Sequence, residues 1–212
     1  LDLSARNDWS STLAYTSHEK SGFFYPSVGF SLIFNKLMTL PQWVSLAKIR
    51  GAYSMVGNDI PMFITNPSSH ITAGGEFLAS DAAPFKDMEP EMTHSFEAGI
   101  EARFLKNRIG LNATFYKTNT RNQFFKLPTL SGDKYAYRYV NAGDIQNVGW
   151  EISLDAVPLL TNHFKWKTEV NFSTNRNKII SLHEALKEFL YGPTSFSSSY
   201  AMKLVKGGSI GD

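Results

Sequence analysis

The feature that most constrains the fold is a strict alternation of apolar and polar residues, repeated along most of the chain. In 94–104, Phe96, Ala98, Ile100, Ala102 and Phe104 alternate with Glu97, Glu101 and Arg103. A period of two places alternate side chains on opposite faces of a β-strand. The apolar phase carries no charge in any of the repeats, which lie at 22–34, 43–55, 94–104, 109–116, 148–156 and 164–174, with the end of a similar strand at 1–6. The pattern predicts an all-β, antiparallel protein.

Strands with one apolar face are typical both of a soluble β-sandwich and of a membrane β-barrel. The connections separate the two. Short links at 35–42, 105–108 and 158–163 alternate with long links at 8–22, 57–93, 121–143 and 176–202. Barrels in outer membranes have short turns on the periplasmic side and long loops outside. The asymmetry favours a membrane barrel, with the long links facing the medium.

Aromatic residues bracket several strands in their apolar phase, as in the pairs Phe24 and Phe34, Trp43 and Tyr53, and Phe164 and Phe172. At roughly 3.3 Å per residue and a tilt near 40°, eight to ten residues project to about 20–25 Å along the membrane normal. This height matches an apolar band between two aromatic girdles. The charged face would then line a hydrated interior. The sequence contains no run of eighteen apolar residues, so it predicts no membrane-spanning helix.

Composition excludes several other functions. The chain has 212 residues with a formal net charge of +2 and scattered basic residues, so it lacks the basic patch of a nucleic-acid-binding protein. It has no Cys, and none of its His residues forms an H-E-x-x-H motif. Gly207-Gly208-Ser209-Ile210-Gly211 fits G-x-S-x-G, but neither a helix nor a His follows it. We therefore predict no enzyme activity, no catalytic residue, no metal and no cofactor.

Ordered phrases along the strands resemble the barrel of the SusC/RagA family of TonB-linked, or TonB-dependent, outer-membrane transporters. They are Asn7-Asp8-Trp9, Phe24-Tyr25-Pro26-Ser27-Val28-Gly29, Ile49-Arg50-Gly51-Ala52-Tyr53, Asn141-Ala142-Gly143-Asp144 with Gly149-Trp150-Glu151, and Asn171-Phe172-Ser173. The resemblance covers nearly the whole chain. It implies a partial barrel domain over residues 1–212, with about seven to eight strands of a 22-stranded barrel. A plug, a TonB box and the barrel-closing strands are not recognisable here.

The resemblance also implies a function and a location. We expect a part of a transporter that crosses the outer membrane of a Gram-negative bacterium of the Bacteroidetes type several times. Its implied partners are a SusD-like surface lipoprotein, the TonB complex through an N-terminal region, and outer-membrane lipid. The implied cargo is a large nutrient, an oligosaccharide in preference to a peptide. The alternatives are a soluble β-sandwich that binds carbohydrate, or a surface adhesin.

Ligand contacts are expected on the long loops, because a rigid barrel can hold variable loops in place. Aromatic side chains beside polar groups can stack on sugar rings or on peptide side chains. The candidates are Phe63, Phe77, Phe124, Phe125, Tyr135 and Tyr137. Two further elements are expected near the end of the chain, a short loop helix over 181–190 and an eighth strand that starts at Met202.

Overall fold

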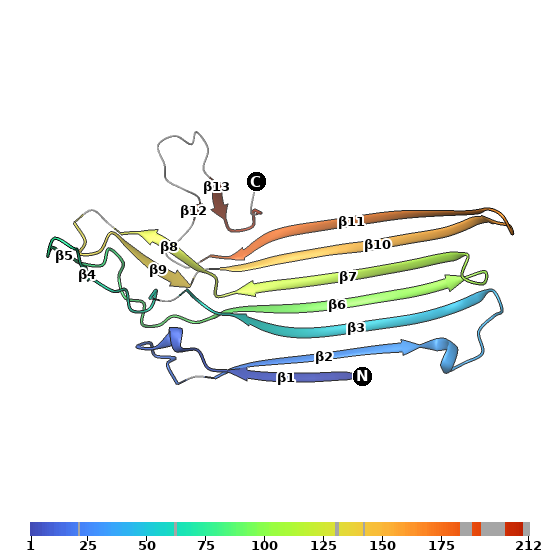
Figure 1. Cartoon of the computed structure of the whole chain (residues 1–212), viewed down its shortest axis with the longest axis horizontal. Coiled ribbons are helices and arrows are strands. Elements are labelled where there is room, and N and C mark those ends of the chain that lie inside the picture. Colours follow the sequence, from blue (N-terminus) through green and yellow to red (C-terminus); the bar gives the residue numbers. More distant parts are fainter. Residues whose placement is uncertain are drawn as a thin grey trace.

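The computed structural model describes residues 1–20, 22–61, 63–129, 132–141, 143–182, 188–191 and 202–209. Its main feature is a seven-stranded sheet in which every neighbouring pair is antiparallel. The order is β1 (Asp2–Asp8), β2 (Phe23–Ile33), β3 (Val44–Asn58), β6 (Glu91–Phe104), β7 (Ile109–Arg121), β10 (Asp144–Leu160) and β11 (Lys165–Ser181). The sheet is open, with β1 and β11 at its edges (Figure 1). The all-β prediction is confirmed.

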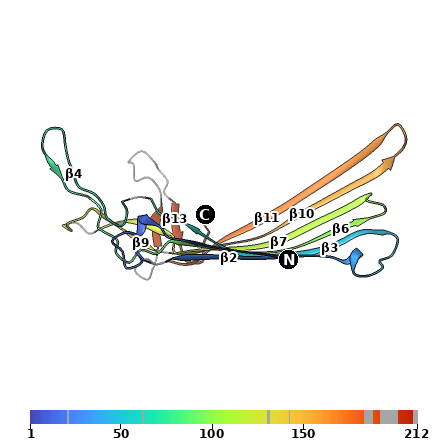
Figure 2. The same cartoon turned by 60° about the horizontal axis from the view of Figure 1, so that its bottom comes forward.

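All long connections leave the same end of this sheet, at the left of Figure 1, and the short turns lie at the other end. The short turns include Leu105–Arg108 between β6 and β7, where Leu105, Lys106 and Asn107 all have positive φ. A 3-10 turn, η2 (Phe34–Lys36), begins the link from β2 to β3. The sheet twists, so that β10 and β11 swing away from β1–β3 towards the short turns (Figure 2).

The long connections contain small elements of their own. These are η1 (Ser11–Leu13) and the strand pairs β4 (His70–Ile71) with β5 (Phe77–Leu78), β8 (Phe124–Pro128) with β9 (Tyr137–Asn141), and β12 (Glu188–Tyr191) with β13 (Met202–Val205). Buried apolar side chains gather in this loop layer. One cluster contains Leu13, Ile60, Ile64 and Met88, and the other contains Phe125, Leu127, Ile179 and Leu204.

Near the end of the chain, one expectation was wrong and one is confirmed in part. Ser181, expected to begin a helix, ends β11 opposite Asp144, and residues 188–191 form a strand. Strand pairing therefore overrides the helical spacing wherever 181–190 is described, and residues 183–187 lie outside the described part. A strand does start at Met202, but it pairs with β12 and does not extend the main sheet.

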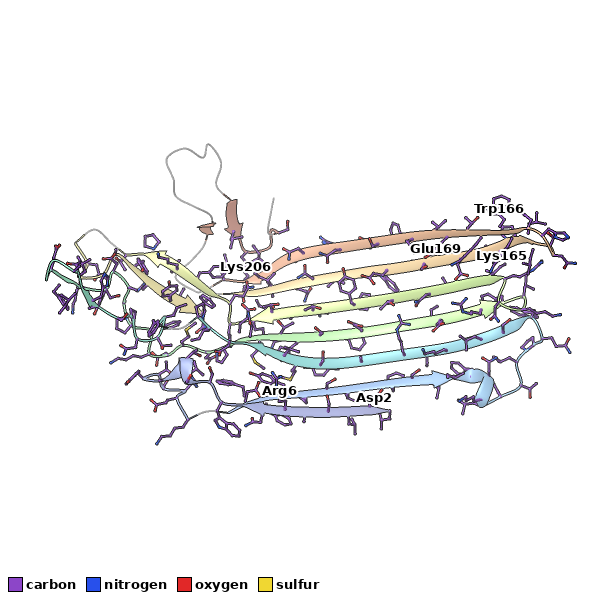
Figure 3. All side chains as sticks on the ribbon, in the orientation of Figure 1. Asp2, Arg6, Lys165, Trp166, Glu169 and Lys206 are labelled. Atoms are coloured by element: carbon purple, nitrogen blue, oxygen red, sulfur yellow. The ribbon has the colours of Figure 1, made fainter. Side chains whose placement is uncertain are left out.

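Alternation gives the sheet two unlike faces. On β11, Trp166 leaves the strand on one side, and Lys165 and Glu169 leave it on the other (Figure 3). In a β-sandwich the apolar face would be covered by a second sheet. Here large apolar side chains on that face are open, with Ile100 45% and Phe172 58% exposed. Among the described residues, no helix is long and apolar enough to cross a membrane.

Candidate functional site

Register aligns the apolar phases of neighbouring strands into continuous rows. The middle row is made of aliphatic and aromatic side chains, one from each of six strands: Leu32, Ile49, Ile100, Ala113, Ile152 and Phe172. The next row towards the long loops includes Phe30, Phe115 and Trp150, and the rings of Phe115 and Trp150 lie 5.1 Å apart. The apolar face is therefore a continuous band, too large and too open for an ordinary soluble surface.

Aromatic side chains border this band along an oblique line. On the loop side the line passes through Phe24 on β2, Tyr53 and Phe96 on β3 and β6, Phe115 and Trp150 on β7 and β10, and Phe172 on β11. From β2 to β11 the line crosses five strand spacings, which is roughly 24 Å across the sheet. Over this distance it shifts by about eight residues, which is roughly 26 Å along the strands. The slope of about 45° is close to the tilt of strands in a closed barrel. The line is therefore level with a membrane surface if the strands are tilted.

A second set of aromatic residues borders the band near the short turns. The rings of Trp43 and Phe104 stack with centroids 5.7 Å apart, and Trp166 is 55% exposed at the start of β11. On β6 the band runs from Phe96 to Phe104, which corresponds to roughly 20 Å along the membrane normal. The band has the height of a membrane interior.

The opposite face carries charges that pair across strands. Glu101 on β6 accepts from Lys48 on β3 at 3.5 Å and lies 3.8 Å from Arg103, which in turn lies 3.7 Å from Asp155 on β10. Arg50 donates to Thr114 Oγ1 at 2.5 Å and to Asn112 Oδ1 at 3.2 Å. These groups are partly exposed, so each pair contributes little to stability. Their arrangement makes a hydrated, polar wall.

In the loop layer, Asp59 joins two long connections. Its carboxylate accepts from Ser10 Oγ at 2.8 Å, from Thr12 Oγ1 at 2.6 Å and from the Ile60 backbone N–H at 2.8 Å. Burial acts to raise the pKa of Asp59, but the hydrogen bonds from Thr12, Ser10 and Ile60 outweigh it and lower the pKa below its usual value. Ile60 and Leu13, which flank this clamp, are buried in one cluster.

We predict that acid loosens this clamp. A carboxylate with a lowered folded-state pKa stabilises the fold above its unfolded pKa, and this contribution is lost as pH falls through the folded pKa. Asp59→Asn should cost about 1 kcal/mol of local stability, since solvent screens the exposed group. Hydrogen exchange of residues 9–16, corrected for intrinsic rates, should rise below about pH 4 in the native protein.

The control for this prediction is Asp81→Asn, because among the described residues only the backbone oxygen of Asp81, and not its carboxylate, accepts hydrogen bonds. This variant should leave exchange of residues 9–16 unchanged. Protection that is the same at pH 7 and pH 3 in the unsubstituted protein would show that Asp59 does not hold the two loops together.

The predicted ligand-contact residues occupy different positions in the loop layer. Phe63 and Phe77 are 65% and 66% exposed, and Phe63 has a φ of 67° between the buried Ile60 and Ile64. Phe124 and Tyr137 lie on the same face of the β8–β9 pair, where Tyr139 contacts both rings. Phe125 points the other way into a buried cluster, and Tyr135 is half-buried. The structure therefore does not bring all six together.

Sequence reasoning missed the polar contacts that order these loops. The Asp59 clamp joins residues 47 to 49 positions apart, so no local pattern could reveal it. Asn141, at the end of β9, donates to the backbone oxygens of Glu89 and Asn122 and accepts from the Glu89 N–H. Its signal was an Asn two residues before a Gly at the end of a strand. Within the described ranges, no group of His, Asp and Glu side chains is arranged to hold a metal.

Comparisons with known proteins define the class. The family described as TonB dependent receptor-like, beta-barrel matches residues 1–190, and the chain belongs to that family. Members of this family are outer-membrane proteins of Gram-negative bacteria and receptors rather than enzymes.

Two individual relatives of the chain are also TonB-dependent receptors. The chain is 25% identical over 169 residues to TonB-dependent receptor P39 of Formosa agariphila. The aligned segment covers 74% of the chain and 16% of that protein. The chain is 29% identical over 135 residues to TonB-dependent receptor SusC of Bacteroides thetaiotaomicron, covering 60% of the chain and 13% of SusC. The chain thus spans less than a fifth of the length of these two relatives.

A solved structure supports the same fold. The RagAB peptide importer in its open-open state superposes with a TM-score of 0.78 at 22% identity, covering 99% of this chain and 22% of that chain. The closed-closed state gives a TM-score of 0.77 with 97% of this chain covered. The resemblance to SusC/RagA barrels is confirmed.

Proposed function

We propose that this chain forms part of the wall of a TonB-dependent importer for a large nutrient, an oligosaccharide in preference to a peptide. The observation that carries the proposal is the seven-stranded sheet with an open apolar band on one face and paired charges on the other. Such a sheet is stable only if lipid covers the band and water or polar protein covers the charges.

The proposed orientation follows from the ends of the sheet. The end that carries the long connections holds buried clusters and exposed aromatic side chains. An outer face that binds a ligand needs both, because the clusters hold the loops in place and the aromatic side chains are open to the ligand. We propose that this end faces the medium, where a SusD-like lipoprotein delivers the nutrient, and that TonB acts from the periplasm on a region outside residues 1–212. The related SusC and the RagAB importer support this assignment.

Deleting the gene that encodes the native protein tests the proposed transport. The deletion strain should lose growth on one oligosaccharide class while it keeps growth on the corresponding monosaccharide, and a plasmid copy should restore growth. Loss of growth on peptides alone would indicate that the cargo is a peptide. Unchanged growth on every tested nutrient, with loss of surface adhesion, would favour an adhesin.

Exposed loop aromatics should contribute directly to ligand affinity. Phe77→Ala and Phe63→Ala are each expected to weaken binding of the nutrient identified by growth by about 2- to 10-fold, because a lost stacking contact is worth about 0.5–1.5 kcal/mol. Isothermal titration of the purified native protein measures this. Ile71→Ala is the matched control, because Ile71 pairs with Phe77 and is 70% exposed but not aromatic.

Phe125 should behave differently from the exposed aromatics. It is 8% exposed and packs with Leu127, Ile179 and Leu204. Phe125→Ala should therefore destabilise the loop layer, by about 3–5 kcal/mol for a large buried aromatic, and should not remove a direct contact. If Phe63, Phe77 and Ile71 variants all bind as the unsubstituted protein does, these loop aromatics are not ligand contacts.

A further inference from the structure

Three cations without a carboxylate partner lie on the apolar side of the sheet, beyond the loop-side aromatic line, where a fourth cation, Arg121, pairs with Asp144. Register places Phe96, Lys117, Val148 and Arg176 in one row, and Lys178 lies in the next row outward, opposite Gln146. Because alternate residues share a face, Lys117, Arg176 and Lys178 project to the same side as Ile100 and Phe172. We call these three residues the cationic rim.

The cationic rim is open and has no internal counter-charge. All three side chains belong to exposed residues, and no carboxylate of the described residues lies within ion-pair distance of them. The nearby carboxylate of Asp144 is occupied, since it lies 3.6 Å from Arg121 Nε and accepts from Asn119 Nδ2 at 2.8 Å. The rim therefore presents uncompensated positive charge.

The spacing of the rim suits phosphate groups. Lys117 and Arg176 are two strands apart, roughly 9–10 Å, and Arg176 and Lys178 are two residues apart, roughly 7 Å. Arg recognises phosphate with a fork of N–H donors, and Lys adds compact charge. Asn119 and Gln146 lie on the same face in the row of Lys178 and are joined by a hydrogen bond of 3.1 Å. The surface is polar and cationic directly above an apolar band.

We infer that the cationic rim binds the phosphate groups of lipid headgroups in the outer leaflet of the membrane. The rim begins one row beyond Phe115 and Trp150, where the headgroups would lie, and on β11 only Thr174 separates Arg176 from Phe172. A lipid can fill both parts at once, with its chains on the band and its phosphate on the rim. The inference rests on the lipid-facing assignment made under the proposed function.

Binding of a phosphorylated lipid to the native protein in detergent tests this. The probes are lipid A with its phosphates and the same lipid after dephosphorylation, each measured by native mass spectrometry. The triple variant Lys117→Gln, Arg176→Gln, Lys178→Gln should bind phosphorylated lipid A roughly 10- to 100-fold more weakly. The matched control removes three exposed loop cations at the same end of the molecule, as Lys20→Gln, Lys86→Gln, Lys134→Gln, and should retain affinity.

Each outcome decides the inference. Selective loss in the rim variant, together with weak binding of the dephosphorylated lipid, supports it. Equal loss in the two triple variants, no loss in either, or equal binding of both lipids overturns it. The single variant Lys117→Gln gives the same test, with a smaller loss, if the triple variant does not fold. A separate experiment tests the lipid-facing assignment itself. If a variant with Arg in the apolar band inserts into the membrane normally, that assignment fails.

Discussion

Ile152→Arg is expected to destabilise the membrane-inserted form by about 1–3 kcal/mol, because Ile152 lies on the lipid-facing side two residues inside the aromatic line at Trp150. Ile152 lies in the middle row of the apolar band, between Ala113 on β7 and Phe172 on β11. An Arg at this position could not pair with any charge in the band and would lose its hydration in lipid. Urea titration of the native protein folded into lipid vesicles measures the effect.

The neighbouring position supplies the control. Ser153 lies on the polar face between Asn112 and Asn171, in the row that contains Glu101. Ser153→Arg introduces the same side chain one residue away and should change stability by less than about 1 kcal/mol, since water and carboxylates are at hand. Ile100→Arg should cost more, about 2–4 kcal/mol, because Ile100 lies midway between Phe96 and Phe104 on β6, at the middle of the band. Equal costs at Ile152 and Ser153 would contradict the assignment of the two faces.

Gly149→Ala should destabilise the sheet by about 1–3 kcal/mol, because β10 and β11 approach too closely for a side chain at this position. A Cβ atom on Gly149 would collide with the Thr174 carbonyl oxygen and would lie 2.5 Å from Tyr116 Oη. The Tyr116 hydroxyl reaches across Gly149 and donates to Asn175 Oδ1 at 3.3 Å. A rotation of Tyr116 cannot relieve the backbone contact, so the strands must separate.

Gly29→Ala is the matched change in the same sheet. A Cβ atom on Gly29 would have its nearest neighbour, the Gly51 carbonyl oxygen, at 3.9 Å, which is an ordinary contact. Ala in a strand loses less conformational freedom than Gly, so this variant should be neutral or slightly more stable. The same urea titration compares the two. A loss at Gly29 equal to that at Gly149 would show that the close approach at Gly149 does not matter.

Alternation predicted the strands because the two solvents of this sheet, lipid and water, impose opposite polarity on its faces. The predicted 94–104 and 148–156 lie inside β6 and β10, which the structure extends to Glu91–Phe104 and Asp144–Leu160. The added residues 91–93 and 144–147 lie beyond the loop-side aromatic line, where the alternation fades. At the other end, β10 continues to Leu160, into the short link expected at 158–163. There the strands continue because their neighbours supply hydrogen bonds.

The loop layer was less predictable because its contacts are distant in sequence. The β8–β9 pair lies inside the long link expected at 121–143, and the Asp59 clamp has no local signature. The ligand-contact aromatics remain predictions. Their burial shows which of them a ligand can reach directly, Phe63 and Phe77 above all, and that Phe125 packs inside.

The central claim is that the sheet crosses the outer membrane with its long connections outside. Single Cys residues at two exposed positions, Asp133 between β8 and β9 and His163 between β10 and β11, report the two ends. Both variants are made in the native protein, freed of any other exposed thiol, and intact cells are treated with an impermeant maleimide.

We predict that the Asp133→Cys protein is labelled in intact cells and that the His163→Cys protein is labelled only after the outer membrane is permeabilised. Labelling of the Cys at position 163 alone would invert the proposed orientation. Labelling of both in verified intact cells would contradict a membrane-spanning sheet.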